Sequence, residues 1–306
     1  MKILVTGGAG FIGSHIVDGL LGAGHTVVVV DNLTTGNRRN LNPNATFCEI
    51  DLLDPKLAEV FDREKPDIVN HHAAQVDVRK AVANPSFDAQ QNIMASLHLI
   101  ELCRKNRVKK IIFASTGGAV YGEPLYLPVD ENHSIRPLSP YGISKHTVEM
   151  YLDFASVTFG LNYTVLRYAN VYGPRQNAHG EAGVIAIFGM AMLNGKRPTI
   201  FGDGSSTRDY IFVEDVVRAN LLALEAGNQQ IYNVGTGCQT SLNDLFNGLK
   251  RAARVEMEAI HAPARLGEVD RIALTNDKIK RDLGWMPSHS LKEGLEKTVR
   301  YYRSLR

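Results

Sequence analysis

Residues 2–15, KILVTGGAGFIGSH, decide the fold of this chain. An apolar run is followed directly by a glycine-rich turn, and the pattern of a helix begins at Phe11. The glycines of this turn are Gly7, Gly8, Gly10 and Gly13. Their spacing fits a turn between a strand and a helix where missing side chains let a pyrophosphate approach the backbone. The helix N-terminus, with Phe11 and Ile12, then faces the phosphates, so we expect a dinucleotide to bind here.

The second apolar run, Val27–Val30, ends at Asp31. A carboxylate at the end of the second strand of such a unit can hold the ribose hydroxyls of the adenosine. Arg38 and Arg39 could face the 2′-phosphate of NADP, but Asp31 would repel that group. We therefore expect NAD as the cofactor.

The first half of the chain alternates short apolar runs with helical patterns. The runs lie at 3–5, 27–30, 68–69 and 111–113, and the helical patterns cover 11–21 and 87–105. Strands that are apolar on both faces are typical of a parallel sheet covered by helices. The alternation therefore predicts an α/β fold with a doubly wound parallel sheet, a Rossmann fold.

The pattern changes after about Asn170. Glycine and proline become more frequent, beginning with Gly173–Pro174, and strand-like pieces become short and isolated. We expect residues 1–170 to form an NAD-binding domain, which also receives a segment near 210–240. Residues 171–306 are expected to form, in the main, a smaller mixed α/β substrate domain.

Composition and charge exclude several classes of protein. The chain has 34 Lys and Arg against 32 Asp and Glu, and its net charge of +2 gives no reason to expect nucleic acid or an anionic membrane as partner. No apolar run approaches the ~18 residues that span a bilayer, and the opening strand leaves no room for a signal peptide. Cys48, Cys103 and Cys238 are too far apart for a metal site or a disulfide framework. We expect a cytoplasmic protein without a metal.

The stretch YGISK places Tyr141 and Lys145 four residues apart, on one face of a helix that we expect to begin at Pro140. A neighbouring ammonium favours the phenolate, and so does an oxidised nicotinamide, so the tyrosine pKa falls from about 10. The pair can therefore serve as a general base near neutral pH. Ser115 and Thr116 follow an apolar run, and so should lie at the edge of the sheet where ligands bind.

With these motifs the sequence resembles the extended short-chain dehydrogenase/reductases and, within that family, the nucleotide-sugar 4-epimerases. The resemblance extends over essentially the whole chain. The matching segments are 6–15, 31–36, 51–52, 71–75, Asn92, 115–116, 120–122, 139–145, 166–174 and 208–211. So many matches in this order are specific for the family, and less so for the individual member.

The resemblance implies the rest of the cofactor site. Besides the glycine turn and Asp31, the residues that match NAD contacts of the family are Asn32, Thr35, Gly36, Asp51, Leu52, Ala73, Gln75, Asn92, Tyr141, Lys145 and Tyr168. Asp51–Leu52 would touch the adenine, and Ala73 and Gln75 would line the loop beside the cofactor. The family's cofactor is NAD, which agrees with the expectation from Asp31.

The resemblance also implies a reaction. Tyr141 would take the proton of the sugar 4-hydroxyl, Lys145 would assist it, and the Thr116 hydroxyl would bind the same oxygen. Because this chain has an extra residue at Gly117–Gly118, Ser115 stays an alternative to Thr116. Hydride would leave C4 and return to the other face of the 4-keto sugar. This inverts C4 of a UDP-hexose, with UDP-glucose and UDP-galactose as the expected pair.

The substrate contacts that the resemblance implies are Thr116, Tyr141, Asn170, Val184, Thr199, Phe201, Arg208 and Arg265. Arg208 and Arg265 match diphosphate contacts, although either one alone could equally form a surface ion pair. Asn170 would bind the diphosphate or the sugar, and Thr199–Phe201 would flank the uracil. A position near Ile272 matches one that varies with the size of the sugar, so UDP-N-acetylhexosamines and UDP-uronic acids stay open.

Other functions compete with this one. Nucleotide-sugar 4,6-dehydratases carry an Asp-Glu pair, and related decarboxylases a glutamate, where this chain has Gly117–Gly118. A reductase that releases its cofactor is a weaker alternative. A catalytically silent NAD-binding regulator typically lacks the tyrosine or the lysine, whereas Tyr141 and Lys145 are both present. An epimerase therefore stays the expectation.

The helices expected over 87–105 and from Pro140 to Phe159 carry apolar side chains at helical spacing, which usually face a core. These side chains are Ile93, Met94, Leu97, Ile100, Met150, Tyr151 and Phe154. In the family the corresponding helices pair across a two-fold axis into a four-helix bundle. The resemblance therefore implies a homodimer.

Overall fold

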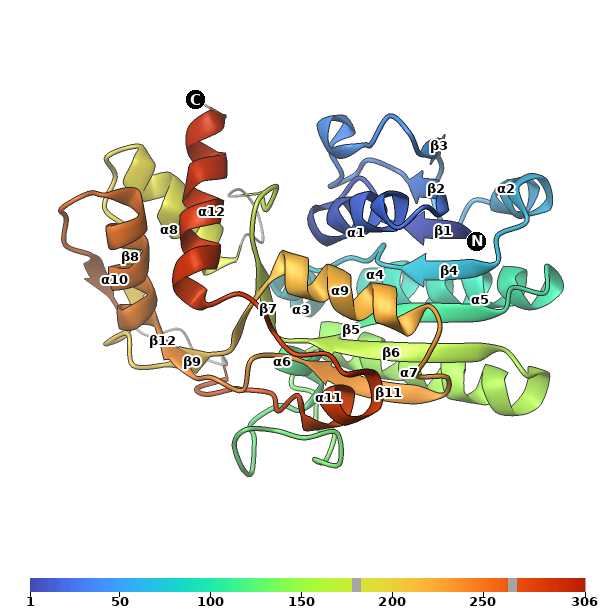
Figure 1. Cartoon of the computed structure of the whole chain (residues 1–306). Coiled ribbons are helices and arrows are strands. Elements are labelled where there is room, and N and C mark those ends of the chain that lie inside the picture. The colour runs from blue at the N-terminus through green and yellow to red at the C-terminus, as the bar shows by residue number, and fades with distance from the viewer. Residues whose placement is uncertain (178–182, 264–268, 306) are drawn as a thin grey trace.

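The centre of the protein is a seven-stranded sheet in the order β11-β6-β5-β4-β1-β2-β3 (Figure 1). The computed structural model describes residues 1–177, 183–263 and 269–305. The strands of the sheet are β1 (Lys2–Thr6), β2 (Thr26–Asp31), β3 (Thr46–Glu49), β4 (Ile68–His71), β5 (Lys110–Thr116), β6 (Asn162–Tyr168) and β11 (Gln230–Val234). Neighbouring strands are parallel throughout, and the order reverses between β1 and β4. The prediction of a doubly wound parallel sheet is confirmed.

Helices cover both faces of this sheet. One face carries α1 (Phe11–Gly22), α9 (Val213–Ala223) and, beside β11, α11 (Asp277–Leu283). The other face carries α2 (Leu57–Glu64), α5 (Ala95–Lys105) and α7 (Pro140–Phe159). Side chains of β2 alternate between the two cores, with Val27 and Val29 in the first and Val28 and Val30 in the second. This is why β2 is apolar throughout rather than at every second residue.

The helical pattern expected over 87–105 is one helical segment with a wider turn in its middle. Its parts are α4 (Pro85–Ala89), the π-helical turn η2 (Gln90–Met94) and α5. Asn84 caps the start by accepting a hydrogen bond from the N–H of Phe87. Turns of this kind often occur at functional sites, and η2 carries Asn92.

Most of the remaining elements form a smaller part of the molecule, which is built around a third hydrophobic core (Figure 1). Its elements are β7 (Asn170–Tyr172), α8 (Val184–Leu193), β8 (Thr199–Phe201), β9 (Thr207–Arg208), β10 (Tyr210–Phe212), β12 (Thr240–Ser241), α10 (Leu242–Ala253), β13 (Ile260–Ala262) and α12 (Leu291–Ser304). Three short helices, η1 (Arg38–Asn40), α3 (Val78–Ala83) and α6 (Gly117–Val120), lie in loops of the sheet. The chain enters the smaller part after β6, returns to the sheet through α9 and β11, and ends in α12.

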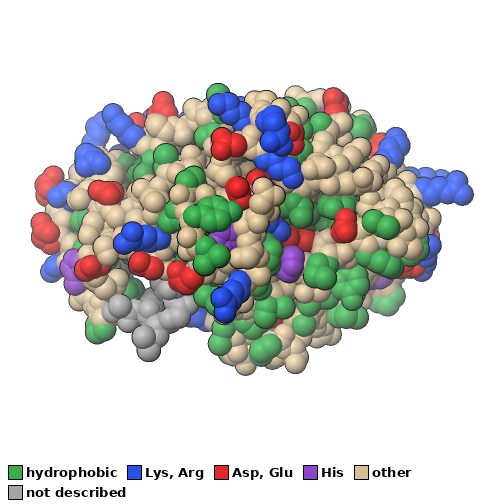
Figure 2. Space-filling model, turned by 90° about the horizontal axis from the view of Figure 1, so that it is seen from below, with side chains coloured by type: hydrophobic (Ala, Val, Ile, Leu, Met, Phe, Trp, Pro, Cys, Tyr) green, Lys and Arg blue, Asp and Glu red, His purple; other side chains and the backbone are tan. Residues whose placement is uncertain are grey.

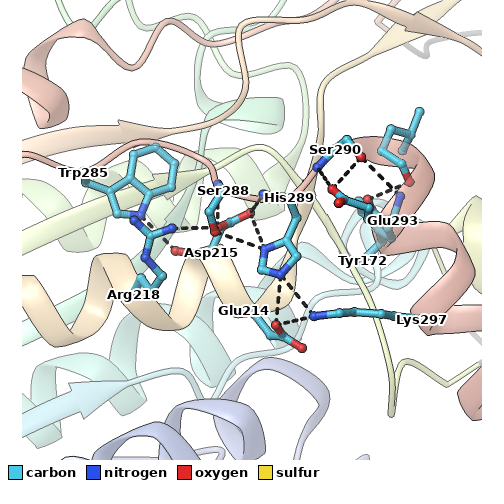
Figure 3. Close-up of polar contacts among 11 residues, drawn as sticks. Tyr172, Glu214, Asp215, Arg218, Trp285, Ser288, His289, Ser290, Glu293 and Lys297 are labelled. Atoms are coloured by element: carbon cyan, nitrogen blue, oxygen red, sulfur yellow. Dashed lines mark hydrogen bonds and ion pairs between the residues drawn. The ribbon is translucent and has the colours of Figure 1, made fainter.

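A buried carboxylate joins α9 to the segment that leads into α12 (Figure 3). Asp215 is inaccessible to solvent, and accepts hydrogen bonds from the N–H and the hydroxyl of Ser288 at 2.9 and 2.6 Å and from the N–H of His289 at 3.2 Å. Lys297 of α12 pairs with Glu214, the neighbour of Asp215, at 2.8 Å. This polar cluster fixes α12 against α9, and with it the smaller part against the sheet.

The outer face of α7 departs from the expectation that its apolar side chains face a core. Met150, Tyr151 and Phe154 are exposed, and so is Met94 on η2, whereas Ile100 is buried. The expectation is wrong for these four residues because the sheet covers only one side of each helix. Seen from below, hydrophobic side chains gather over the right part of the molecule, where α7 lies (Figure 2). Within the three described ranges, none of the helices has both the length and the apolar character to cross a membrane.

Candidate active site

The glycine turn between β1 and α1 packs so closely against neighbouring backbone that it has no space for side chains. Gly7 has a φ of +70°, a left-handed conformation that glycine adopts without strain. A Cβ atom on Gly7 would lie 2.7 Å from the backbone nitrogen of Ala73, and one on Gly13 would overlap the carbonyl oxygen of Gly7. Among the described residues, no side chain caps α1 at Gly10. The N–H groups of its first turn can therefore receive an anion, which is the fit that a pyrophosphate requires.

Asp31 lies at the carboxyl end of β2, where the sequence placed a ribose contact. Its two carboxylate oxygens accept hydrogen bonds from the N–H groups of Ala9 at 3.0 Å and Leu33 at 2.8 Å. A Cβ atom on Gly36 would lie 2.7 Å from Oδ1, so the loop closes tightly around the carboxylate. These contacts hold a negative charge at the edge of the sheet beside the glycine turn.

The polar groups around this carboxylate have partners of their own. Arg38 forms an ion pair with Glu49, and its guanidinium lies 5.5 Å from the centroid of the Phe47 ring. Asn32 donates a hydrogen bond of 2.6 Å to Asp51, which links the loop after β2 to the loop after β3. Because Arg38 already has an acidic partner, the arrangement suits ribose hydroxyls better than a 2′-phosphate.

Gln75 and Asn92 meet where β4 ends, although they are far apart in the sequence. Asn92 donates from Nδ2 to the carbonyl of Gln75 at 2.9 Å, and accepts on Oδ1 from the N–H of Gln75 at 2.9 Å. The N–H of Ala73, in the same loop, donates to the hydroxyl of Thr6 at 3.1 Å. The structure therefore brings three residues expected at the cofactor to one edge, next to the end of β1.

Tyr141 and Lys145 lie in the first two turns of α7, which begins at Pro140 as predicted. Lys145 donates from Nζ to the carbonyl of Ala114 at 2.8 Å. The same nitrogen lies 5.9 Å from the centroid of the Tyr141 ring and 4.8 Å from that of Phe113. α7 thus holds the ammonium between the end of β5 and the phenol.

Burial disfavours the charged form of both members of this pair. Burial lowers the pKa of Lys145 to about 8. Burial also raises the pKa of Tyr141, and the negative charge of Asp88 adds to this effect. Since each charge alone is penalised, an ammonium on Lys145 and a phenolate on Tyr141 favour each other. The pair is suited to exchange a proton with a bound hydroxyl near neutral pH.

Ser115 and Thr116 face opposite sides of β5, as neighbours in a strand do. The hydroxyl of Ser115 donates a buried hydrogen bond of 2.5 Å to Glu149. Thr116 ends the strand, and its Oγ1 lies 3.8 Å from the point where a Cβ atom on Gly118 would sit. Oδ1 of Asn170 lies 3.7 Å from that same point. The geometry therefore favours Thr116 over Ser115 as the hydroxyl at the site, and it brings Thr116 close to Asn170.

The two glycines after Thr116 have different surroundings. A Cβ atom on Gly117 would overlap the side chain of Leu274. One on Gly118 would meet only ordinary van der Waals neighbours. The sequence lacks the acidic pair that the resemblance places at these positions in a 4,6-dehydratase. At Gly117 the packing against Leu274 also leaves no space for a larger side chain.

Tyr168, expected at the cofactor, ends β6 and is buried. Its hydroxyl accepts a hydrogen bond of 2.8 Å from Asn220, and Nε2 of His72 lies 3.1 Å away. The neighbouring His71 lies 2.7 Å from the Thr6 hydroxyl. The contact of Tyr168 with NAD stays a prediction. Over the described part of the chain, no group of His, Cys, Asp and Glu could hold a metal ion.

Apart from Thr116 and Tyr141, the described residues among the expected substrate contacts lie in the smaller part of the molecule. Asn170 is in β7, Val184 begins α8, Thr199 and Phe201 are the ends of β8, and Arg208 is in β9. Arg208 donates from Nη1 to the carbonyls of Thr207 at 2.9 Å and Asp270 at 3.2 Å. Arg265 lies outside the described residues. Ile272 is 3% exposed within the first core, and so does not line an open surface.

Sequence reasoning missed the buried charges beneath the site, which are Asp88, Glu149 and Arg167. Arg167 donates from Nη2 to Glu149 at 2.6 Å, and both side chains are almost inaccessible. An arginine inside an apolar strand is a signal that could have been used, because a buried charge needs a partner. Glu149 follows Lys145 by one helical turn and so shares its face. Nothing comparable marks Asp88 in the sequence.

Comparisons with known proteins agree with this geometry. The profile of the NAD-dependent epimerase/dehydratase family matches residues 3–235. A UDP-glucose 4-epimerase of Thermotoga maritima, solved with UDP-glucose, is 51% identical with a TM-score of 0.98, and the match covers 100% of this chain and 99% of that one. A UDP-glucose 4-epimerase of Thermus thermophilus, solved with NAD, is 42% identical with a TM-score of 0.96 over the whole of both chains, 100% of each. The UDP-glucose 4-epimerase of Mycolicibacterium smegmatis is 43% identical, and 99% of each sequence is covered.

Proposed function

The chain belongs to the NAD-dependent epimerase/dehydratase family, and from this premise we propose that it is a UDP-glucose 4-epimerase, which interconverts UDP-glucose and UDP-galactose in galactose metabolism. One observation carries the proposal: Tyr141 and Lys145 lie on α7 beside the end of β5, where Gly117 and Gly118 bring no acidic side chain. Oxidation at C4 and its reversal is then the chemistry that the side chains can support. Relatives with this activity match the chain from end to end.

NAD fits the edge of the sheet through the glycine turn, the carboxylate of Asp31 and the Gln75–Asn92 pair. When bound, NAD supplies the oxidant, which takes a hydride from C4 of the sugar and gives it back. Lys145 would hold the nicotinamide ribose. The adenine would lie along Asp51–Leu52.

Side chains of the protein transfer the proton of the sugar 4-hydroxyl. Tyr141 takes it from the 4-hydroxyl as C4 is oxidised and returns it to the same oxygen at the end of the reaction. The ammonium of Lys145 stabilises the phenolate, and the hydroxyl of Thr116 hydrogen-bonds the oxygen that loses the proton. These roles balance, since the product contains the same atoms as the substrate and no acid or base beyond the pair is needed.

Inversion requires the keto sugar to present its other face, so the nucleotide must be anchored while the sugar is held loosely. Arg208 supplies a guanidinium for the diphosphate from β9, and Thr199 and Phe201 would flank the uracil from β8. The missing side chain at Gly118 leaves the polar atoms Oγ1 of Thr116 and Oδ1 of Asn170 as the neighbours of this position. We propose that the smaller part of the molecule is the nucleotide-sugar domain for this reason.

The exposed side of α7 supports an assembly of two copies. Met150, Phe154 and Val157 are exposed there, and so is Met94 on η2, and exposed apolar side chains that lie together are typical of an interaction surface. We propose that two copies pair through α7 and α5 into a four-helix bundle. A homodimer in the cytoplasm is the expected form.

The test is to incubate the purified protein with UDP-glucose, UDP-galactose, UDP-N-acetylglucosamine and UDP-glucuronic acid, and to resolve the products. The proposal expects UDP-glucose and UDP-galactose to convert into one another, and Tyr141→Phe to abolish the conversion. Inversion of only an N-acetylated or a uronic sugar would assign the alternative substrate. Formation of a 4-keto-6-deoxy sugar would identify a dehydratase and overturn the proposal. Acid denaturation, followed by chromatography of the released nucleotide, identifies the cofactor.

A further inference from the structure

A buried carboxylate that plays no part in the proposed reaction lies directly behind the tyrosine–lysine pair. Asp88, in α4, is inaccessible to solvent. Its Oδ2 accepts a hydrogen bond of 2.6 Å from the hydroxyl of Ser144, and its Oδ1 accepts from Nδ2 of Asn92 at 2.9 Å and from Nε2 of Gln75 at 3.0 Å. One side chain therefore joins the loop after β4, the turn η2 and α7.

Its partners are the residues that shape the cofactor edge. Asn92 and Gln75 are bonded to each other through the backbone of Gln75, and Asp88 fixes the amide end of both side chains. Ser144 lies on α7 next to Lys145 and one turn from Tyr141. The position of Asp88 thus couples the cradle of the cofactor to the helix that carries the base.

The charge of Asp88 distinguishes it from the other carboxylate of this region. Glu149 is neutralised by Arg167, which donates to both of its oxygens at 3.0 and 2.6 Å. Within the described residues Asp88 forms no ion pair, and its partners are a hydroxyl and two neutral amides. Among these contacts no counter-charge offsets a negative charge on Asp88, and that charge acts on Lys145 and Tyr141.

Ionisable groups lie on several of the elements that pack around Tyr141 and Lys145. Lys145 interacts electrostatically with Asp88 of α4 and Glu149 of α7. It also interacts with His71, the last residue of β4, and with His72, which follows β4. The histidines are neutral, because burial and the charge of Lys145 lower their pKa values, that of His72 to about 3. Burial lowers the pKa of Lys145, and Asp88 raises it; for Tyr141 burial and Asp88 both raise the pKa.

We propose that Asp88 is a positioning residue of the epimerase: its buried carboxylate ties the cofactor loop and the turn η2 to the part of α7 that carries Tyr141 and Lys145, and it places a negative charge there. The inference rests on the proposed function. Without this charge Lys145 and Tyr141 would both lose their protons at lower pH. With it, the pair stays protonated until a bound NAD and sugar change the balance.

The decisive variant is Asp88→Asn, which removes the charge and keeps the shape. The amide oxygen can still accept from Asn92 and Gln75, while the new NH2 group can donate to the hydroxyl of Ser144, which accepts instead of donating. We expect the acid limb of the pH profile of kcat/KM to move to lower pH by about one unit. Asp88→Ser, a smaller neutral variant, is expected to shift the limb in the same direction, so the test does not depend on one variant folding.

Two controls separate charge from architecture. Ser144→Ala removes the bond to α7 and leaves the carboxylate, so its acid limb is expected to coincide with that of the unmodified protein. Asp215→Asn neutralises a carboxylate that is equally buried but lies between α9 and α12. It is expected to lower stability without moving the limb. A shift in both controls, or none in either Asp88 variant, would overturn the proposal.

A second measurement does not require turnover. The tyrosinate band in ultraviolet difference spectra, taken against Tyr141→Phe on protein with its bound dinucleotide quantified, reports the ionisation of Tyr141 itself. It is expected to appear at lower pH in Asp88→Asn. If no UDP-sugar is converted, the proposed function fails, yet this titration still decides the role of Asp88. An unchanged titration in an active enzyme overturns the role of Asp88 alone.

Discussion

The hydroxyl of Ser115 donates a hydrogen bond of 2.5 Å to Glu149, and this contact turns Ser115 into the interior while its neighbour ends the strand at the site. Glu149 also accepts two hydrogen bonds from Arg167. The same three residues tie β5, α7 and β6 together directly beneath Lys145. The helix turn that carries Lys145 is therefore supported by a buried network of hydrogen bonds.

Thr116 and Ser115 are expected to respond differently to the loss of their hydroxyl groups. Thr116→Ala should lower kcat about 100-fold, because one donor to the reacting oxygen is lost, with little change in stability. Ser115→Ala should leave kcat within a few fold and lower the free energy of unfolding by about 2 kcal/mol, because Glu149 loses a buried donor. Steady-state kinetics and urea denaturation of both variants check this. The reverse pattern would make Ser115 the catalytic hydroxyl.

Removal of one partner of the Glu149–Arg167 pair should be strongly destabilising. Glu149→Gln is expected to lower the free energy of unfolding by about 3–5 kcal/mol, because it leaves the buried guanidinium without its counter-charge. Burial raises the pKa of Glu149, but the bonds from Arg167 outweigh it and the pKa lies below its usual value. The unmodified protein should therefore exceed Glu149→Gln in free energy of unfolding by the full amount at pH values above the ordinary carboxylate pKa. This difference should shrink as the pH falls below about 4. Urea denaturation at pH 7 and pH 3 measures both effects, and an equal difference at the two pH values would contradict the assignment.

The fold could be predicted from the sequence because two independent features identify its first strands. Apolar runs such as Val27–Val30 identify buried strands, and the glycine turn with Asp31 identifies the first two strands of the nucleotide-binding unit in chain order. Tyr141 and Lys145 could be predicted because their spacing has a chemical meaning on a helix. The charge network could not, because Asp88, Asn92 and Gln75 meet only through the path of the chain, and nothing in a single residue type shows which amide a carboxylate will bind.

The exposed side of α7 shows a second limit. Met150 and Phe154 have the spacing of apolar residues that face a core. Periodicity alone cannot distinguish a side chain that packs against the sheet from one that is exposed on the outer side of the helix. The arrangement of the sheet settles which side of the helix is covered. The same holds for Thr116 and Ser115, since the sequence places both at the end of β5 and only the pleat of the strand separates them.

Lys145→Met should change the pH dependence of stability. Burial lowers the pKa of Lys145 from 10.5 to about 8. Between these values the unfolded chain binds the proton and the folded chain does not, so the stability of the unmodified protein rises with pH relative to the variant. The relative gain from pH 7 to pH 10.5 is expected to be about 3 kcal/mol. Urea denaturation across this range tests it, with the exposed Lys105→Met as the control. Parallel curves for Lys145→Met would show that folding does not lower the pKa of Lys145.

Asp31 is expected to set the preference for NAD over NADP. Asp31→Asn removes the charge that repels a 2′-phosphate and weakens the bonds to the ribose, so binding of NADH should weaken about 10-fold while that of NADPH improves. Fluorescence titrations with both dinucleotides measure the ratio. Arg38→Gln serves as the control, because Arg38 is paired with Glu49 and its loss should leave the ratio unchanged. If the ratio of NADH to NADPH affinity changes in Arg38→Gln and not in Asp31→Asn, Arg38 and not Asp31 sets the preference.

The exposed face of α7 is expected to hold two copies of the chain together. Phe154→Glu places a charge at a half-exposed apolar position on the side of the helix that faces away from the sheet, so it should not disturb the core. In a dimer the same position is desolvated, and an unpaired buried charge there should drive dissociation. Light scattering after gel filtration is expected to give twice the chain mass for the unmodified protein and for Met286→Glu, an exposed apolar position that lies in the segment before α12, and a single chain mass for Phe154→Glu with unchanged circular dichroism. If the unmodified protein is a monomer, or if Phe154→Glu keeps the double mass, the pairing through α7 is excluded.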